Sequence, residues 1–234
     1  EFRRVLFRST LFRSARFIRE AKSTARLRHP NIVALYDFDS FNQIHFFTMD
    51  FIDGMSLDSF IKKQQLSFSQ IVKVMLDILS AIGYAHEEGF IHRDIKPSNI
   101  LVDKKGNIFV TDFGLAKAAS AKTAKISMSG TVIGTPSYMS PEQTQGSEQN
   151  PVDHRTDIYS LGAMLYEMLT GNPPFKGESA YEIFYKLASE EAVEPRKINP
   201  NIPEFLEKIC LKAITKDKTK RYQNTQEKIG RAHV

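Results

Sequence analysis

The stretch HRDIKPSNILV, residues 92–102, gathers several chemically useful side chains in one short segment. Asp94 and Lys96 are two residues apart, so their side chains project to the same side of an extended loop. Asn99 and the later Asp112 carry oxygen atoms of the kind that Mg²⁺ prefers, and no Cys/His cluster suggests zinc. Each feature alone is weak, because a lone Asp–Lys pair is usually a solvated surface pair. The order and spacing of the surrounding motifs decide the interpretation.

Four motifs follow one another along the chain. HRDIKPSN is followed by DFG at residues 112–114, by GTPSYMSPEQ at 134–143 and by DIYSLG at 157–162, and Arg221 lies in the last helical region. In this order the motifs resemble those of the eukaryotic-type (Hanks-type) protein kinases. The resemblance covers essentially all of residues 15–228. It implies an α+β, protein-kinase-like fold, mostly the helical C-lobe with a partial N-lobe.

The resemblance assigns a task to each polar residue. Asp94 would orient a substrate hydroxyl and accept its proton, and Lys96 would neutralise charge on the transferred phosphoryl group. Asn99 and Asp112 would bind Mg²⁺, or Mn²⁺ in its place, beside the phosphates of ATP. We therefore expect phosphoryl transfer from ATP.

The subclass follows from finer matches. Lys96 within DIKPSN resembles serine/threonine kinases, and SPEQ together with DIYSLGAMLYEMLTGNPPF resembles the bacterial members. The implied partners are proteins that carry Ser or Thr.

A second set of residues would position the site without doing chemistry. In the family, the counterparts of Glu142 and Arg221 form an ion pair. The counterpart of Asp157 forms hydrogen bonds with the backbone of the catalytic loop, the segment that HRDIKPSN matches. Thr135 would contact Asp94 and Lys96, and His92 is assigned a structural role.

Regulation is also implied by the resemblance. Arg93 is a positive charge beside Asp94, and such kinases are commonly activated when a phosphate in the activation segment pairs with this arginine. The alternative is that the candidate phosphosites are ordinary solvated hydroxyls of a loop. Autophosphorylation in trans would take place within a homodimer. The segment begins with Phe113 and Gly114, and the candidate phosphosites are Ser127, Ser129 and Thr131.

On the nucleotide side, HFFTMDFIDG resembles the fifth strand and the hinge. Met49 would be the gatekeeper, Asp50 and Ile52 would present backbone groups to adenine, and Leu101 would lie under the ring. A plain apolar strand would look similar. Glu20 matches the helix glutamate that pairs with a lysine of the third strand.

That lysine has no match in this sequence. Nothing resembling G-x-G-x-x-G or V-A-I-K precedes Glu20. We therefore expect this chain to transfer phosphate barely or not at all, although the parent enzyme would be active. The alternatives are a pseudokinase and a scaffold or binding module without phosphotransfer.

Periodicity predicts the elements that must position these residues. Two strands flank a turn at 39–43, and a hairpin turns at DKKGN; Gly89 and Gly171 would end long apolar helices. Residues 112–142 show little periodicity. The expected helices are 16–28, 56–63, 68–88, 156–170, 181–190 and 203–216, and the expected strands lie within 31–53 and at 100–102 and 108–111.

Composition is that of an ordinary soluble globular protein, with 234 residues, 41% of them hydrophobic and 25% charged. A single cysteine, Cys210, allows no intramolecular disulfide and indicates a reducing compartment. No run approaches the length of a membrane span. We expect a cytoplasmic domain, attached to a membrane only through segments outside this sequence.

The two ends carry most of the net charge of +5. Without residues 1–14 and 229–234 the chain is nearly neutral, which argues against nucleic acid as a partner. LFRS occurs twice near the start of the chain. EFRRVLFRS and IGRAHV can be translated from opposite strands of one DNA sequence, and that DNA sequence resembles a sequencing adapter. We expect 1–14 and 229–234 to be non-native, and 15–228 to be a partial kinase domain with an N-lobe remnant at 15–53 and a C-lobe at 54–228.

Overall fold

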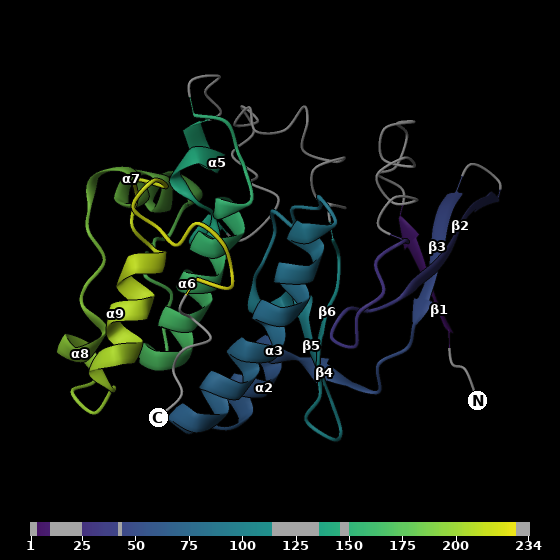
Figure 1. The fold of residues 1–234 in the computed structure, drawn as a ribbon, viewed down its shortest axis with the longest axis horizontal. Coiled ribbons are helices and arrows are strands. Elements are labelled where there is room, and N and C mark those ends of the chain that lie inside the picture. Colours follow the sequence, from purple (N-terminus) through teal and green to yellow (C-terminus); the bar gives the residue numbers. More distant parts are fainter. Residues whose placement is uncertain (1–3, 10–24, 42–43, 114–135, 146–149, 228–234) are drawn as a thin grey trace.

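The computed structural model describes residues 4–9, 25–41, 44–113, 136–145 and 150–227. A small sheet lies at one end of the molecule and the helices lie at the other, with a second small sheet between them (Figure 1). The expected α+β class is confirmed, because short strands precede a run of helices.

The outer sheet has three antiparallel strands. β2 (Leu35–Phe41) and β3 (Ile44–Asp50) form a hairpin, and β1 (Arg4–Ser9) pairs with the other edge of β3. The strand order is therefore β1-β3-β2. Both strands predicted within residues 31–53 are confirmed, but β2 continues through residues 39–41 of the expected turn, and the rest of that turn lies outside the described residues.

The second sheet joins the two parts of the chain. β4 (Gly54–Ser56) pairs with β5 (Ile100–Asp103), which forms a hairpin with β6 (Ile108–Val110). The hairpin turn uses Gly106 at φ 83°, a left-handed conformation that suits glycine. The segment after residue 30 bonds to this sheet: the Val33 amide donates to the Val110 carbonyl at 2.9 Å.

Helices make up the rest of the described chain. Ser56 caps α2 (Leu57–Lys63), and Ser67 begins α3 (Phe68–Glu87) with a capping box. Gly89 at φ 80° follows α3, and Gly171 at φ 80° ends α6, as the sequence predicts. The remaining helical elements are η1 (Pro97–Asn99), η2 (Pro136–Tyr138), α5 (Pro141–Gln145), α6 (Arg155–Thr170), α7 (Ala180–Ser189), α8 (Pro195–Ile198) and α9 (Glu204–Ala213).

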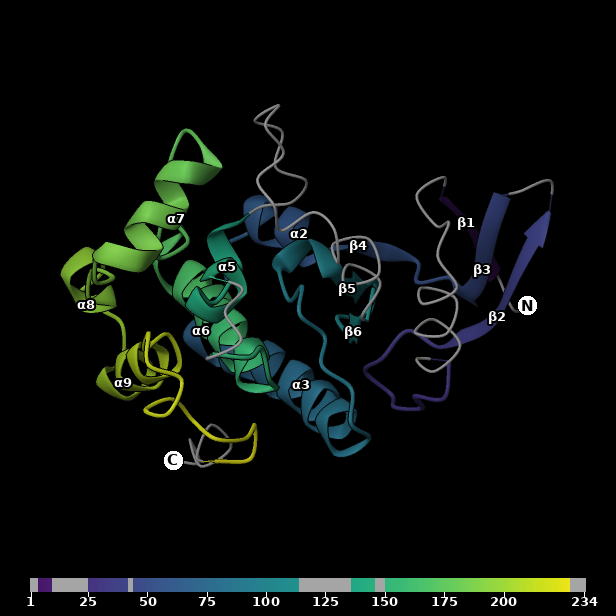
Figure 2. The ribbon, with the colours of Figure 1, turned by 90° about the horizontal axis from the view of Figure 1, so that it is seen from above.

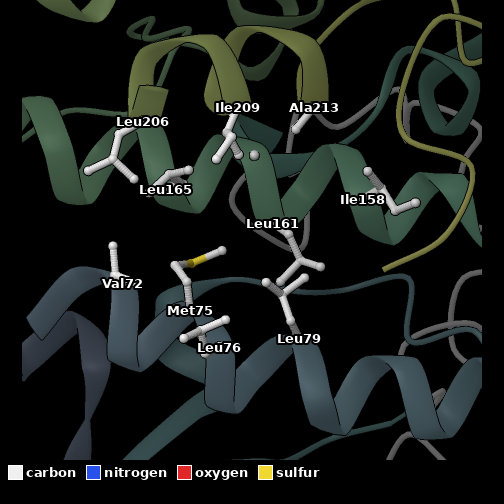
Figure 3. A pocket seen from close by; sticks show the side chains of 11 residues that line it. Val72, Met75, Leu76, Leu79, Ile158, Leu161, Leu165, Leu206, Ile209 and Ala213 are labelled. Carbon is white, nitrogen blue, oxygen red and sulfur yellow. The ribbon is translucent and has the colours of Figure 1, made fainter. Parts of the chain in front are cut away.

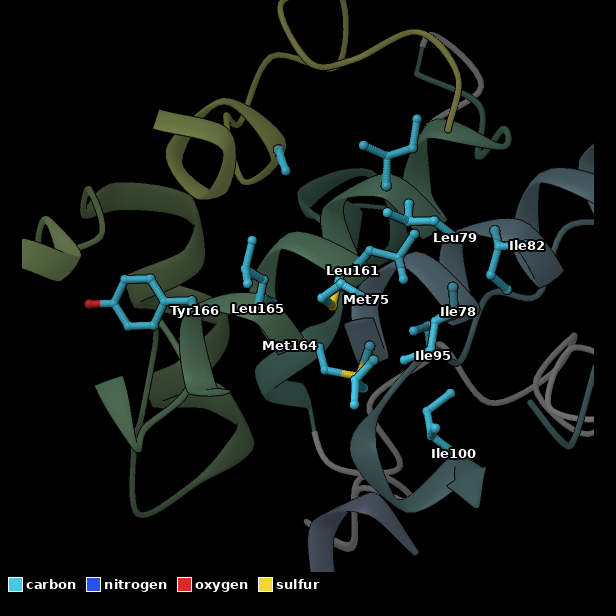
Figure 4. Close-up of a cluster of buried hydrophobic side chains, with 14 of the residues drawn as sticks. Met75, Ile78, Leu79, Ile82, Ile95, Ile100, Leu161, Met164, Leu165 and Tyr166 are labelled. Atoms are coloured by element: carbon cyan, nitrogen blue, oxygen red, sulfur yellow. The ribbon is translucent and has the colours of Figure 1, made fainter. Parts of the chain in front are cut away.

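The core lies between α3 and α6, which run side by side (Figures 1 and 2). Ile78 and Ile82 of α3, Leu161 and Met164 of α6 and Ile100 of β5 belong to one cluster of buried side chains (Figure 4). Among the described residues, α3 is the one helix whose length and apolar composition would allow it to cross a membrane. Nine of its residues are buried in this core, which accounts for its apolar composition.

Some expectations about the elements are wrong. The expectation that the last helix reaches Lys216 is wrong: it ends at Ala213, and the Thr215 amide then donates to the Lys212 carbonyl at 3.4 Å instead of continuing the i to i−4 pattern. Ala25 and Arg26 form a turn, so the helix expected over 16–28 does not extend to Arg28, and its earlier part lies outside the described residues. The elements β4, η2, α5 and α8 were not anticipated.

An apolar cleft lies where α9 crosses α6 above α3, lined by Met75, Leu79, Leu165 and Ile209 among others (Figure 3). Beside it Gly162 lets the two helices approach closely. A Cβ at Gly162 would lie 2.6 Å from the Ala213 Cβ and 2.9 Å from Ile214 Cγ2. Helix packing therefore requires a residue without a side chain here.

This contact predicts the effect of Gly162→Ala. Although alanine in a helix interior is normally favourable by about 0.5–1 kcal/mol, overpacking against Ala213 should lower the free energy of unfolding by about 1–3 kcal/mol. Urea unfolding measures the change. The double variant Gly162→Ala/Ala213→Gly should lose less than the sum of the two single losses. A stabilised Gly162→Ala protein would contradict the close packing.

Candidate active site

The loop after α3 carries the predicted catalytic residues. The Phe90 amide donates to the Ala85 carbonyl at 2.8 Å, which turns the chain away from the helix end. Ile95 and Pro97 are buried and anchor the loop. The Asn99 amide donates to the Lys96 carbonyl at 2.9 Å, and the short η1 helix then leads into β5. The loop is thus fixed at both ends.

Asp157, in the first turn of α6, holds the middle of this loop. Its carboxylate is fully buried and accepts hydrogen bonds from the backbone amides of His92 at 2.8 Å and of Arg93 at 2.7 Å. His86 of α3 reaches the same carboxylate at 2.7 Å. Arg93 has φ 67°, which costs a non-glycine residue of order 1–3 kcal/mol. The bonds to Asp157 offset that strain.

His92 links the loop to the strand that precedes DFG. Its ring is fully buried, and Nδ1 accepts from the Asp94 amide at 3.3 Å. Nε2 therefore carries the hydrogen and donates to the Thr111 carbonyl at 2.9 Å. The ring also contacts that of Phe113, with centroids 4.6 Å apart. His92 thereby ties Asp94 to the segment that carries Asp112.

The structure brings Asp94, Lys96 and Asn99 together. Lys96 Nζ lies 2.8 Å from Asp94 Oδ2, and Asn99 Nδ2 donates to the same oxygen at 2.9 Å and to the Asp94 carbonyl at 2.8 Å. Among the described residues no hydrogen bond reaches Asp94 Oδ1. The carboxylate is thus held through one oxygen while the other can accept a proton.

Asp112 follows β6 in a left-handed conformation, with φ 63°. Burial raises the pKa of its carboxyl, and the Asp94 carboxylate raises it further, while His92 and Lys96 partly offset the rise. A partly desolvated carboxylate close to a second one is an environment that favours a bound cation.

The residues present fit a hard divalent cation. Both amide hydrogens of Asn99 donate to Asp94. The amide oxygen, Asn99 Oδ1, is therefore the atom of this side chain that could bind a cation. Asp112 supplies the carboxylate. Among the described residues there is no cluster of three or more His, Cys, Asp or Glu that could hold a metal ion. The two candidate ligands, Asn99 and Asp112, would both bind through oxygen.

The predicted nucleotide residues lie around the link between the two sheets. Met49 and Asp50 end β3, and the Asp50 amide donates to the Ala34 carbonyl at 3.0 Å. Ile52 lies in the connection to β4. Leu101 is half-buried and points to the opposite face of β5 from the buried Ile100.

Glu142 and Arg221 form a buried ion pair below the site. Two parallel bonds of 2.7 and 2.8 Å join the guanidinium to the carboxylate, and both residues are at most 2% exposed. Burial alone would raise the pKa of Glu142, but the bonds and charge of Arg221 outweigh it and hold the pKa below its usual value. The pair connects α5 to the chain after α9.

Several predicted site residues fall outside the described part of the chain. They are Glu20, Gly114, Ser127, Ser129, Thr131 and Thr135. Their assignments stay predictions.

The structure also shows contacts that the sequence did not indicate. Gln143 of α5 donates to the Arg93 carbonyl at 2.8 Å. Tyr138 of η2 donates to Glu167 of α6 at 2.6 Å, and burial raises the pKa of both groups. Gln143 directly follows SPE in the sequence, but an amide at a helix start carries no signal of a distant partner.

Comparison with known families gives a match over most of the chain. A family model described as a protein kinase domain matches residues 8–229. Serine/threonine-protein kinase PrkC of Bacillus subtilis is 42% identical over 213 residues, which cover 91% of this chain and 32% of PrkC. A probable serine/threonine-protein kinase PknB of Bifidobacterium longum is 41% identical, with the same coverages. The chain thus spans about a third of the length of these curated relatives.

Solved structures show the same fold. Rad53 1–466 in complex with AMP-PNP superposes with a TM-score of 0.78 and 26% identity, over 97% of this chain and 56% of that one. The PknI kinase domain of Mycobacterium tuberculosis gives a TM-score of 0.76 at 22% identity, over 97% and 83% of the two chains.

The buried ion pair predicts a large loss of stability in Glu142→Gln. The Arg221 guanidinium would keep its burial but lose its counter-charge, which should cost about 3–5 kcal/mol of unfolding free energy. Replacing both partners, as Glu142→Leu/Arg221→Met, should recover only part of that loss, because the Thr215 and Lys216 carbonyls lose their donor. A loss below about 1 kcal/mol in Glu142→Gln, the size of a surface pair, would contradict this account.

The free energy of unfolding should depend differently on acid pH in the unsubstituted chain, here called the parent, and in Glu142→Leu/Arg221→Met. Because the pKa of Glu142 is depressed in the folded state, the pair's contribution is complete above the ordinary glutamate pKa of about 4.3 and is lost as pH falls through the folded value. The parent should therefore lose more stability than the double variant below about pH 4. Parallel curves in urea unfolding from pH 6 downward would count against the pair.

Proposed function

The chain belongs to the protein kinase domain family, and on that premise we propose that the protein carrying this domain transfers the γ-phosphoryl group of ATP to serine and threonine hydroxyls of other proteins. The observation that carries the proposal is the joint placement of Asp94, Lys96 and Asn99 on a loop held by Asp157. The names of the relatives, which are bacterial serine/threonine kinases, support the choice of hydroxyl.

The arrangement supports a defined proton path. The substrate oxygen forms the new bond to the γ-phosphorus as the bond to the ADP oxygen breaks, and the hydroxyl proton passes to Asp94 Oδ1. Lys96 and Asn99 fix the carboxylate through Oδ2, so Oδ1 meets the hydroxyl in a set direction. The Lys96 ammonium, 2.8 Å from Asp94 Oδ2, would also offset negative charge on the moving phosphoryl group.

Asn99 and Asp112 are the residues that would hold Mg²⁺, or Mn²⁺, and the bound metal would neutralise charge on the phosphates. Met49, Asp50, Ile52 and Leu101 are the proposed adenine contacts. The half-buried Leu101, on the face of β5 away from the core, supports an apolar contact with the ring.

We further propose that this 234-residue chain transfers phosphate far more slowly than the parent enzyme, because it holds no match to the Gly-rich loop or to the third-strand lysine. β1 pairs with β3 but offers no lysine in its sequence, RVLFRS. The same proposal includes that residues 1–14 and 229–234 derive from adapter DNA and that residues 15–228 are a partial kinase domain. A scaffold module without phosphotransfer is the alternative, and the gene sequence upstream of Ala15 decides between them.

The first test uses the protein encoded by the complete reading frame. It should phosphorylate Ser or Thr of a general protein substrate with ATP and Mg²⁺, and Asp94→Asn should lower kcat by roughly 10²–10⁴-fold. The 234-residue chain should show little or no transfer in the same assay. Asp217→Asn is the matched control, because Asp217 is exposed and asparagine can form the same turn to Thr219. An Asp94→Asn enzyme as fast as the parent would overturn the proposed role.

A second test concerns activation. We propose that a phosphate on Ser127, Ser129 or Thr131 pairs with Arg93, which precedes the catalytic aspartate, and that this phosphate arrives by autophosphorylation within a homodimer. Mass spectrometry of the active full-length enzyme should find phosphate on at least one of these residues, and phosphatase treatment should lower activity in the parent but not in Arg93→Met. An active enzyme with all three hydroxyls unmodified would contradict it.

A further inference from the structure

We infer that Gln143 is a positioning residue for the catalytic aspartate, acting through the carbonyl of Arg93; this inference rests on the proposed function. The side chain of Gln143 donates from Nε2 to the Arg93 carbonyl at 2.8 Å. That carbonyl belongs to the peptide bond that joins Arg93 to Asp94. Gln143 therefore contacts the peptide group that carries the Asp94 amide, from an element 50 residues further along the chain.

The Arg93–Asp94 peptide needs support from several sides. Arg93 has φ 67°, a conformation that a non-glycine residue keeps only when its surroundings fix it. Asp157 accepts the Arg93 amide at 2.7 Å and thereby fixes the peptide before Arg93. His92 Nδ1 accepts the Asp94 amide at 3.3 Å. The Arg93 carbonyl is the other polar group of the Arg93–Asp94 peptide, and Gln143 donates to it.

The orientation of Gln143 is itself fixed. Its Oε1 accepts from the Ser140 amide at 3.0 Å and from Ser140 Oγ at 3.2 Å, so the amide group is held with Nε2 toward Arg93. Ser140 is fully buried, and its hydroxyl also bonds that of Thr156 at the start of α6. Because Thr156 precedes Asp157, the contacts form a closed ring through α6, the catalytic loop and α5.

This ring distinguishes Gln143 from a residue that only stabilises α5. Bonds to Ser140 would suffice to fix the start of the helix, and they use Oε1 alone. The other end of the same amide bonds a strained turn beside the proton acceptor. An error of about 1 Å in the place of a reacting group can slow catalysis about 10²-fold, so the loss of this bond should appear in kcat.

The test replaces one atom group of Gln143. Gln143→Glu keeps an oxygen for Ser140 but puts a carboxylate oxygen against the Arg93 carbonyl, so the bond to the catalytic loop is lost and a repulsive contact between two acceptors replaces it. In the full-length enzyme kcat should fall about 10- to 100-fold while the KM for ATP stays within about twofold. The matched control is Thr144→Val, which loses the bond from Thr144 Oγ1 to the Pro141 carbonyl in the same helix but no contact with Arg93.

Ser140→Ala adds a graded case. It removes the hydroxyl bonds to Gln143 and Thr156 but keeps the Ser140 amide as a donor to Oε1. Its kcat should lie between those of the parent and Gln143→Glu. A Gln143→Glu enzyme with kcat within twofold of the parent would overturn the inference, and so would a joint loss of kcat, ATP affinity and melting temperature, which is the result of a purely structural role.

A second measurement does not depend on activity. Hydrogen–deuterium exchange of the 234-residue chain reports the amides of His92 and Arg93, which donate to Asp157, and the amide of Asp94, which donates to His92 Nδ1. In Gln143→Glu these amides should exchange about tenfold faster, and in Thr144→Val they should not change. Unchanged exchange would sink the inference even if the full-length protein transferred no phosphate, whereas faster exchange in an inactive parent would fault the proposed function alone.

Discussion

The buried carboxylate of Asp157 is the interaction on which the site depends. A carboxylate without water is costly unless hydrogen bonds satisfy it, and here two backbone amides of the catalytic loop and the ring of His86 do so. The same bonds fix the turn that carries Asp94. Satisfying the carboxylate and ordering the loop are therefore one event, and the loop cannot relax without exposing an unpaired charge to the core.

α6 extends this dependence through the molecule. One side of its first turn holds the catalytic loop, and Thr156 bonds Ser140 ahead of α5. Ser160, one turn later, donates to the Tyr138 carbonyl at 2.8 Å, and Gly162 receives α9 at close range. A helix with partners on every side must be buried all round, which explains why twelve of its residues are buried. Its position is set by packing, and the polar contacts then set the loop.

Sequence patterns predicted the elements well where periodicity or capping is strong. The apolar spacing of α3 and the glycines after α3 and α6 indicated those helices and their ends. Failures came where tertiary contacts decide. α9 stops at Ala213, ahead of the segment whose carbonyls bond the buried Arg221, and α5 forms where no period was visible. Contacts such as that of Gln143 with Arg93 join residues far apart in sequence, so neither spacing nor propensity reveals them.

In the outer sheet, a strand can satisfy the fold without carrying the side chain that a function requires. β1 pairs with β3 in six successive Cα partners, from Arg4 with Asp50 to Ser9 with His45. Such pairing uses backbone groups, so an extended segment of almost any sequence can fill the edge of a sheet. Overall similarity to a solved kinase therefore does not show that each strand carries its functional side chain. Function is argued from residues: Asp94, Lys96 and Asn99 lie in mutual contact, whereas the sequence of β1 contains no lysine.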